Sequence, residues 1–437
     1  MKLSLIFPRF KYKTGDPPIG LALIAAIVRR ADHDVEVIDS TFHPTMRFVN
    51  NRLKSFKPDA VCIYVDSLSF NPAIKIADNA KKNGKLVIFG GPHATLKPES
   101  LVKHADYVIS GEADEAILEI LEGKHKGKNI LKPKRPDLSK IPIPAYDLLE
   151  MDKYIRLWHP LDSINPNLKG TSIISSRGCP FKCSFCQPVL DNIFGKGVRS
   201  RTVSSVIEEI KYLKKNYDVD GVFFHDDTFT IRKKWALEFS QKLIDENIDI
   251  LWGINTRVDQ LDEKLMTKMH EAGLRVMHLG IESGSQRVLD EIYNKGIELS
   301  KVPETITKAK KIGIQCLCFF MLGAPGETEK EIEKTIIFAA SLDATEATAT
   351  IATPLPGTYL HERTKKNYEV TNDFSDFDYY KNRAFKDPKL SLKKLKWFQK
   401  KLLFKFYLHS KRWPYIAKHL FSIKGWRTMY LKIMRFM

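Results

Sequence analysis

The sequence predicts an α/β protein with two successive strand–helix alternations followed by a basic helical region. Residues 1–123 and 169–356 each alternate short β-branched runs with segments of helical periodicity, which is typical of parallel sheets covered by helices. Residues 124–168 between them are rich in proline, so we expect an extended linker that packs over both domains. Residues 388–437 contain fourteen Lys or Arg and no Asp or Glu, in a chain of 437 residues with a net charge of +18.

The first alternation is predicted to form a doubly wound, Rossmann-like parallel sheet. The expected strands are 3–7, 35–38, 60–65, 86–89 and 107–109, and the expected helices are 21–30, 73–82 and 115–121. In such a sheet, ligands bind beyond the carboxyl ends of the strands. The loops at these ends contain Ser67, Gly90, Gly91, Gly111 and Glu112, and glycine there lets the backbone approach a ligand closely.

The second alternation contains six β/α units, too few to close an eight-stranded barrel. The expected strands are 171–175, 221–224, 251–255, 276–280, 315–320 and 347–352, and the expected helices are 203–215, 234–246, 263–271, 303–311 and 329–341. The strand ends carry Asp226, Asp227, Arg257, Glu282, Ser283 and Gly323. Taken singly, each charged residue among them can equally belong to an ordinary ion pair at the start of a helix.

Three cysteines stand at spacing C-x3-C-x2-C directly after the first of these strands. Cys179, Cys183 and Cys186 lie on one polar loop, and three thiolates on such a loop can hold three irons of a 4Fe–4S cluster while the fourth iron stays open. A structural zinc site is the alternative, but zinc prefers four protein ligands and no second pair follows. Buried core thiols are the other alternative, which fits a polar loop poorly. The remaining cysteines lie in apolar runs typical of a core: Cys62, Cys316 and Cys318.

The cysteine spacing resembles that of the radical S-adenosylmethionine (SAM) superfamily. The resemblance implies a partial barrel open on one side, a fourth iron chelated by SAM, and Phe185 lying against the adenine. Relatives carry Gly-Gly-Glu after the second strand to bind the SAM amino group, and this chain departs from that motif. Asp226 or Asp227 could substitute, because a carboxylate accepts hydrogen bonds from an ammonium, and the Arg257 guanidinium could form a bidentate pair with the SAM carboxylate. Glu282, followed by Ser283, matches a residue that binds the ribose or the amino group, and Gly323 matches a turn near the adenine.

The first 123 residues resemble the cobalamin-binding domain that precedes the catalytic domain in one radical SAM class. The matching segments are 17–21, 35–39, 90–93 and 111–112. The resemblance implies cobalamin contacts from Ser67, Gly90, Gly91, Gly111 and Glu112. The D-x-H-x-x-G motif, whose histidine ligates cobalt, is absent, so His93 is not expected to be a cobalt ligand. The alternative is a Rossmann-like domain without a ligand.

The combined resemblance implies a cobalamin-dependent radical SAM enzyme. Such an enzyme would methylate an unactivated carbon through a 5′-deoxyadenosyl radical and methylcobalamin, and would need an electron donor such as flavodoxin or ferredoxin. Members of the class that form or rearrange rings, including an anaerobic porphyrin cyclase branch, provide the main alternative. A non-catalytic iron–sulfur protein that binds membrane or nucleic acid is the alternative from another class.

Residues 357–437 are predicted to form a substrate-side segment and a basic amphipathic helical region. Leu395, Phe398, Leu402 and Phe406 recur at helical spacing among lysines, and tryptophans and tyrosines follow. Packing on the barrel, contact with an anionic membrane and binding to another partner all fit this pattern, and nucleic acid is not the expected partner. The region favours a hydrophobic, possibly lipid, substrate. Six cysteines without a disulfide pattern favour the cytoplasm, with a peripheral position on the inner face of the membrane as an option.

Overall fold

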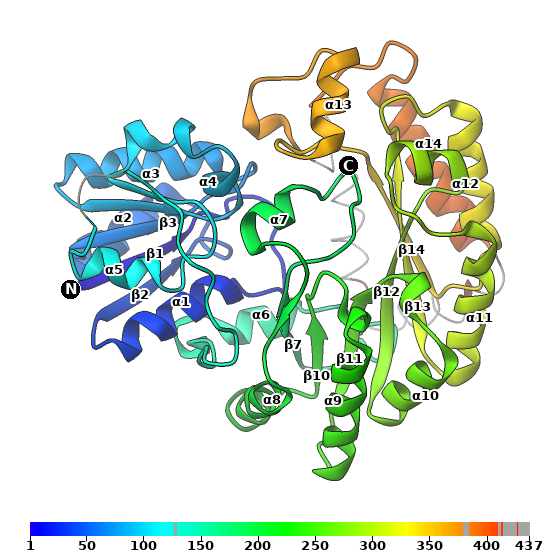
Figure 1. The fold of residues 1–437 in the computed structure, drawn as a ribbon, viewed down its shortest axis with the longest axis horizontal. Coiled ribbons are helices and arrows are strands. Elements are labelled where there is room, and N and C mark those ends of the chain that lie inside the picture. Colours follow the sequence, from blue (N-terminus) through cyan, green and yellow to red (C-terminus); the bar gives the residue numbers. More distant parts are fainter. Residues whose placement is uncertain (126–128, 379–383, 410–411, 414–425, 427–437) are drawn as a thin grey trace.

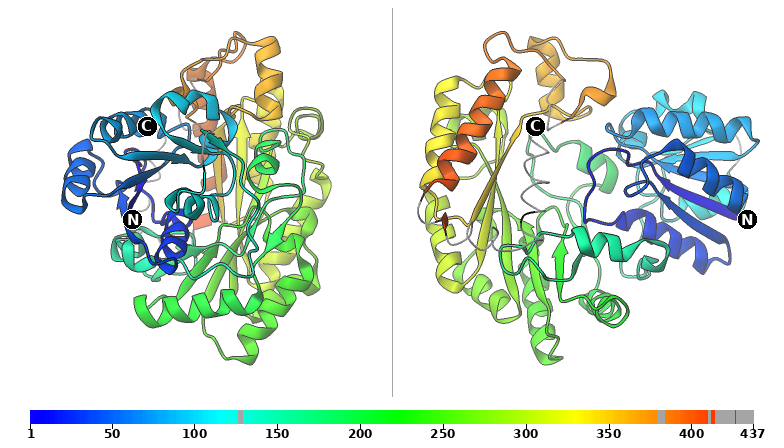
Figure 2. Two further views of the ribbon diagram at one scale, coloured as in Figure 1. Left: turned by 60° about the vertical axis from the view of Figure 1, so that its left-hand side comes forward. Right: turned by 180° about the vertical axis from the view of Figure 1, so that it is seen from behind.

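The computed structural model of the chain describes residues 1–125, 129–378, 384–409, 412–413 and 426. The N-terminal sheet and the larger half-barrel lie side by side, with the linker running between them (Figure 1). Two further views show that the barrel helices cover only the outer side of the curved sheet (Figure 2). Among the described residues, no helix has the length and apolar character needed to cross a bilayer.

The N-terminal sheet is fully parallel, in the order β2-β1-β3-β4-β5-β6, as a doubly wound sheet requires. Helices α1 and α5 cover one face, and α2 and α3 cover the other (Figure 1). The bounds are β1 Lys2–Phe7, α1 Ile19–Arg30, β2 Asp34–Asp39, α2 Met46–Phe56, β3 Ala60–Tyr64, α3 Phe70–Lys82, β4 Leu86–Gly90, α4 Pro92–Leu96, β5 Tyr107–Ile109, α5 Ala116–Leu121 and β6 Ile130–Leu131. All five predicted strands and the three predicted helices are present.

The structure adds four helices and strands to the predicted N-terminal sheet and linker, one of them the short helix α4 after β4. Helix α2 was not predicted. Only Val49 of this helix is fully buried, so the apolar periodicity of its sequence is weak. Strand β6 extends the sheet into the predicted linker, where an edge position tolerates nearby prolines. Helix α6 (Met151–Leu157) corrects the expectation of a helix-free linker, since it occupies a stretch without proline between Pro144 and Pro160.

The linker joins the two apolar cores. Tyr146 is fully buried and its hydroxyl donates to Glu209 on the barrel helix α8 (Val203–Tyr217). From α6, the buried Tyr154 hydroxyl donates to Asp39 at the end of β2. These contacts confirm the expected packing over both domains and hold the sheet against the barrel.

The second sheet is a parallel half-barrel in the order β14-β13-β12-β11-β10-β7. The principal bounds are β7 Gly170–Ile173, α8 Val203–Tyr217, β10 Gly221–Phe224, α9 Lys233–Asp245, β11 Leu251–Thr256, α10 Glu263–Glu271, β12 Leu274–Glu282, α11 Val302–Ile312, β13 Gln315–Leu322, α12 Glu329–Ser341 and β14 Glu346–Ile351. A small hairpin, β8 (Ser176–Arg177) with β9 (Arg199–Ser200), and helix α7 (Val189–Phe194) flank the cysteine loop. All six predicted strands and five predicted helices are present, and the open side confirms the partial barrel.

Two C-terminal helices complete the described chain: α13 (Tyr359–Asn367) and α14 (Leu392–Tyr407). Helix α14 packs on α12 and on the edge strand β14, with the four apolar residues that the spacing predicted facing inward. Gln399 Nε2 donates to the carbonyl of Ala349 (2.6 Å) and the Tyr407 hydroxyl donates to the carbonyl of Ala347 (3.1 Å). These bonds satisfy backbone groups of β14 that would otherwise form an open sheet edge. The predicted aromatic tail beyond Trp413, except Trp426, lies outside the described residues.

Candidate active site

The cysteine loop is held in place by hydrogen bonds from several elements. The backbone N–H of Ser184 donates to the carbonyl of Tyr293 (2.7 Å), and its hydroxyl donates to the carbonyl of Ile292 (2.6 Å). The buried side chain of Gln187 donates to the carbonyls of Cys179 (3.3 Å) and Phe181 (3.2 Å). The loop is therefore shaped by the protein itself.

All three cysteines line one cavity of about 310 Å³ at the carboxyl ends of the barrel strands. Arg257 Nη1 donates to Cys183 Sγ (3.6 Å), and the Thr228 hydroxyl lies 3.7 Å from Cys179 Sγ. Burial raises the pKa of the Cys179 and Cys186 thiols, so iron would have to displace their protons. Among the described residues, no three His, Cys, Asp or Glu side chains are arranged for a single metal ion. Three thiols converging on one cavity fit the donor set of a cluster with one open iron.

A buried ion pair stands in the same cavity. Lys295 Nζ donates to Glu282 Oε1 at 2.6 Å, and the ammonium lies 5.6 Å from the centre of the Phe185 ring. A Cβ atom at Gly280 would lie 2.4 Å from Glu282 Oε1 and 2.7 Å from Lys295 Nζ, so only glycine leaves room for the pair. Sequence reasoning missed Lys295, because a lysine in an Asn-Lys-Gly turn is normally solvated. The cavity thus offers one cationic and one anionic group side by side.

Arg257 lies in the cavity, but its guanidinium is already engaged. Its Nε and Nη2 atoms each donate to Asp259 at 2.9 Å, and Nη2 also donates to the carbonyl of Lys295 (2.7 Å). The guanidinium stacks 3.8 Å over the ring of Phe181. Arg257 could form a bidentate pair with a bound carboxylate only if Asp259 were displaced. While Asp259 is in place, Nη1 is the guanidinium nitrogen that faces the cysteines.

The two neighbouring aspartates take different positions. Asp226 accepts hydrogen bonds from the Ser175 backbone (2.8 Å) and hydroxyl (2.6 Å) and from Arg232 (2.8 Å), so its carboxylate stabilises the strand end. Asp227 lines the cavity instead. Burial and the adjacent charge of Asp226 raise the pKa of Asp227 to about 6. Of the two, Asp227 is the carboxylate available to a ligand.

Two other predicted SAM-site residues lie against helices. Ser283 is fully buried and its hydroxyl pairs with that of Thr335 on α12 at 3.2 Å. Gly323 has a φ of +82°, and a Cβ there would lie 2.6 Å from the Leu395 side chain of α14. Neither residue lines the cysteine cavity in the structure. Phe185 does line it, with its ring edge-to-face against Tyr293 at 5.3 Å.

Strand-end loops of the N-terminal sheet face this half-barrel. Asp16, after β1, accepts a hydrogen bond from Ser172 of β7 (2.7 Å) and pairs with His225 after β10 (3.0 Å). Glu112, after β5, forms short ion pairs with Arg177 and Arg199 on the hairpin beside the cysteine loop. The Glu112 carboxylate therefore joins the two domains, and its contact with cobalamin stays a prediction.

The glycines at the sheet edge differ in what surrounds them. A Cβ at Gly90 would meet nothing within 4 Å, which leaves space beside the backbone for a ligand. Gly91 has a φ of +108°, and a Cβ there would lie 2.9 Å from the carbonyl of Val65. Gly111 also has a positive φ, of +123°, and its N–H donates to the Thr95 hydroxyl (3.0 Å). Ser67 lies half-buried in the turn after β3. The open flank of Gly90 fits close approach by cobalamin.

His93 is buried where the N-terminal domain meets the C-terminal region. Its ring packs against Phe70 and against Phe374, which also contact each other, and its Nε2 atom lies 3.0 Å from the Ser100 hydroxyl. Burial lowers its pKa to about 4. This placement agrees with the expectation that His93 is not a cobalt ligand.

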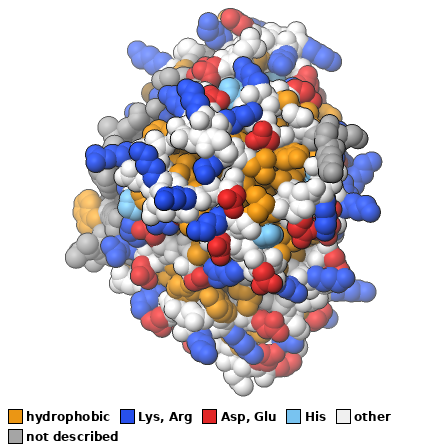
Figure 3. Space-filling model, turned by 90° about the vertical axis from the view of Figure 1, so that its left-hand side faces the viewer, with side chains coloured by type: hydrophobic (Ala, Val, Ile, Leu, Met, Phe, Trp, Pro, Cys, Tyr) orange, Lys and Arg blue, Asp and Glu red, His pale blue; other side chains and the backbone are white. Residues whose placement is uncertain are grey.

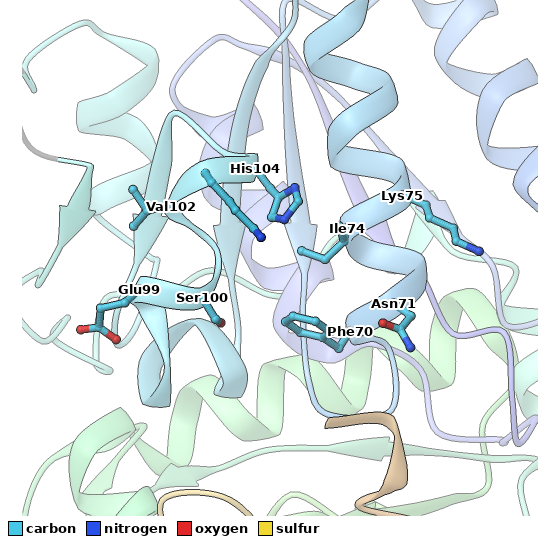
Figure 4. A pocket seen from close by; sticks show the side chains of 9 residues that line it. Phe70, Asn71, Ile74, Lys75, Glu99, Ser100, Val102 and His104 are labelled. Atoms are coloured by element: carbon cyan, nitrogen blue, oxygen red, sulfur yellow. The ribbon is translucent and has the colours of Figure 1, made fainter. Parts of the chain in front are cut away.

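A larger surface hollow of about 930 Å³ lies between α3 and residues 98–104 (Figure 4), and none of its lining residues lines the cysteine cavity. Phe70, Ile74 and Val102 supply its apolar lining. Its His104 is paired with Asp78 at 2.6 Å, so this ring is already engaged. We assign no chemistry to this hollow.

A loop of three cysteines on a half-barrel, next to an open sheet whose strand ends face it, is the arrangement expected of a two-domain radical SAM enzyme. The family model of the radical SAM superfamily matches residues 173–339, and that of the B12 binding domain matches residues 11–121. The chain belongs to the cobalamin-dependent radical SAM enzymes. Its cofactors are a 4Fe–4S cluster, SAM and cobalamin.

The chain is similar in sequence to two other proteins and in fold to one solved structure. The chain is 36% identical over 424 residues to the uncharacterized methyltransferase PH0819 of Pyrococcus horikoshii, covering 90% of this chain and 88% of that protein. It is 28% identical to the anaerobic magnesium-protoporphyrin IX monomethyl ester cyclase of Rubrivivax gelatinosus, covering 83% and 69%. The solved structure of the radical SAM methyltransferase TsrM from Kitasatospora setae, with cobalamin and a [4Fe-4S] cluster bound, has a TM-score of 0.69 at 16% identity, covering 84% and 78%. At that identity the last likeness shows the fold.

Proposed function

We propose that this enzyme methylates an unactivated carbon of a hydrophobic substrate. The observation that carries the proposal is the lining of the cysteine cavity, where Leu190, Phe319 and Met321 share the space with charged groups. Apolar walls with a few placed polar groups suit an apolar substrate beside a polar cofactor. The name of the relative from Pyrococcus horikoshii supports methyl transfer. When bound, the cluster and SAM supply radical chemistry at carbon and cobalamin supplies the methyl group.

We assign the three cysteines to the cluster and the Glu282–Lys295 pair to the amino-acid part of SAM. The Lys295 ammonium would bind the SAM carboxylate, while Glu282 and Asp227 would accept hydrogen bonds from its amino group. Arg257 Nη1 would add a single donor, since Asp259 occupies the rest of its guanidinium. Phe185 would lie against the adenine. Ser283, Gly323 and Asp226 would support this site through α12, α14 and the strand end rather than by contact.

Replacing Lys295 by methionine is expected to weaken SAM binding by about ten- to a hundredfold, the worth of one charge-assisted hydrogen bond. Equilibrium dialysis of SAM against protein with a fully reconstituted cluster measures the effect. Lys301→Met is the matched control, because it removes a lysine from an exposed pair with Glu298. Unchanged affinity for SAM in Lys295→Met with an intact cluster would contradict the assignment.

For cobalamin, we propose that Gly90, Gly91, Gly111 and Ser67 line the binding face and that no protein histidine ligates cobalt. Glu112 would act through Arg177 and Arg199, and would thereby hold the cobalamin-binding loops in position relative to the cysteine loop. The buried pair of Tyr154 and Asp39 would hold the linker that carries this arrangement.

Ring formation on a porphyrin-like substrate is the second candidate, favoured by the likeness to the magnesium-protoporphyrin cyclase. The same apolar cavity lining fits both reactions. A non-catalytic iron–sulfur protein is the third candidate and predicts no cleavage of SAM at all.

One experiment separates these functions. The reconstituted holoprotein is incubated anaerobically with cobalamin, a low-potential reductant, SAM carrying a CD3 group, and an apolar metabolite extract, and products are followed by mass spectrometry. Methylation predicts 5′-deoxyadenosine together with an apolar product that has gained CD3. Loss of hydrogens without gain of CD3 would instead support the cyclase, and intact SAM would support the non-catalytic protein.

The proposal also implies partners and a location. The cluster would be reduced by a flavodoxin or ferredoxin, and the enzyme would work in the cytoplasm, where the free cysteines are kept reduced. A hydrophobic or lipid substrate would place it beside an anionic membrane surface.

A further inference from the structure

Helix α14 has a second apolar face that stays exposed in the part of the chain that the structure describes. Its inner face buries Leu395, Phe398, Leu402 and Phe406 against α12 and β14. On the opposite side, Trp397, Phe404 and Leu408 are 53%, 68% and 56% exposed. Spacings of seven and four residues place these three side chains on one stripe of the helix, which we call the α14 ridge. A helix that already buries one face needs no further apolar residues for stability.

Lysines border the α14 ridge on both sides. Lys393, Lys396 and Lys400 follow one side at helical spacing, and α14 contains no acidic residue. On the other side, Lys394 and Lys401 form short ion pairs with Glu329 and Glu333 of α12. These pairs attach α14 to α12, so that the α14 ridge faces away from the barrel.

A further exposed apolar residue lies on the neighbouring helix α12. Ile337 of α12 is 56% exposed and stands one turn after Glu333, on the same helix face. The opposite side of the molecule differs, because Lys and Arg there are interspersed with Asp and Glu over the N-terminal domain (Figure 3). On the barrel side, the exposed aromatic groups of α14 lie beside lysines that have no acidic residue on their own helix.

We infer that the α14 ridge docks the enzyme on an anionic bilayer. Trp, Phe and Leu partition into the headgroup region, and lysines near the surface are attracted to anionic lipid, most strongly at low salt. A protein partner is less well matched, because protein interfaces are depleted of lysine. This inference rests on the proposed function and extends it. Because α14 covers the edge of the half-barrel, docking through α14 would bring that edge beside the bilayer, where an apolar substrate dissolves.

Co-sedimentation of the full-length holoprotein with phosphatidylglycerol–phosphatidylcholine vesicles tests this surface. We expect binding at low salt that weakens at high salt, since salt screens the lysines. Trp397→Ser with Phe404→Ser should weaken binding by about tenfold or more, because two large apolar contacts are lost. Point variants are preferable to deleting α14, which would uncover β14 and the residues packed on it.

Charge is tested with a matched pair of double variants. Lys393→Gln with Lys400→Gln should weaken binding, whereas Lys264→Gln with Lys311→Gln removes two exposed lysines elsewhere and should leave it unchanged. Cleavage of SAM should persist in all of these variants, so vesicle binding and the proposed chemistry can fail independently. Wild-type protein that stays in solution at low salt, equal binding to purely zwitterionic vesicles, or full binding by the Trp397/Phe404 variant would each overturn the inference.

Discussion

Replacing any one of Cys179, Cys183 and Cys186 by alanine is expected to abolish the iron–sulfur cluster and, with it, reductive cleavage of SAM. Two thiolates are too few to hold a cubane cluster with one open iron. Iron and sulfide analysis, the visible spectrum of the reconstituted protein and the yield of 5′-deoxyadenosine measure the loss. This is the largest effect that we expect from a single substitution.

Cys318→Ala provides the control for the cysteine variants. Cys318 is fully buried in β13, and its thiol lies in the apolar core. The substitution should lower the free energy of unfolding by about 1 kcal/mol while iron content and SAM cleavage stay at wild-type values. A variant lacking all three loop cysteines that still held iron and cleaved SAM would refute the assigned site.

Replacing Gly90 by leucine is expected to expel cobalamin. A Cβ at Gly90 meets no protein atom within 4 Å, so the unliganded protein should tolerate the side chain while the ligand loses its space. We expect affinity for cobalamin to fall by about a hundredfold or more, as for severe overpacking. Absorbance of bound cobalamin after anaerobic gel filtration measures this, and an unchanged melting temperature of the cobalamin-free protein confirms that the fold is intact.

His93→Ala is the companion variant and should retain cobalamin, because the His93 ring forms a hydrogen bond with Ser100. Gly91 is a poorer test than Gly90, since its φ of +108° would strain any larger residue with or without a ligand. Loss of cobalamin in His93→Ala alone, or retention in Gly90→Leu, would count against the proposed binding face.

The cluster loop and the order of strands could be predicted from the sequence because their signals are local. Three cysteines within eight residues provide three iron ligands whatever the position of their loop in the fold. Alternation of β-branched runs with segments of helical periodicity predicts both sheets. The spacing of Leu395, Phe398, Leu402 and Phe406 likewise predicted the buried face of α14. Helix α2 was missed because a surface helix with one fully buried residue carries little of this signal.

The sequence by itself determined the class of cofactor, the half-barrel and the sheet in front of it. Only the tertiary structure decided which charged groups share the cavity. Lys295 pairs with Glu282, thirteen residues before it in the chain. Asp226 instead pairs with Arg232, and Glu112 pairs with Arg177 and Arg199. An ion pair forms between whichever opposite charges the fold brings together, and residue spacing does not encode that proximity. Ligand spacing on one loop can therefore be read directly, while the partners of single charges depend on packing.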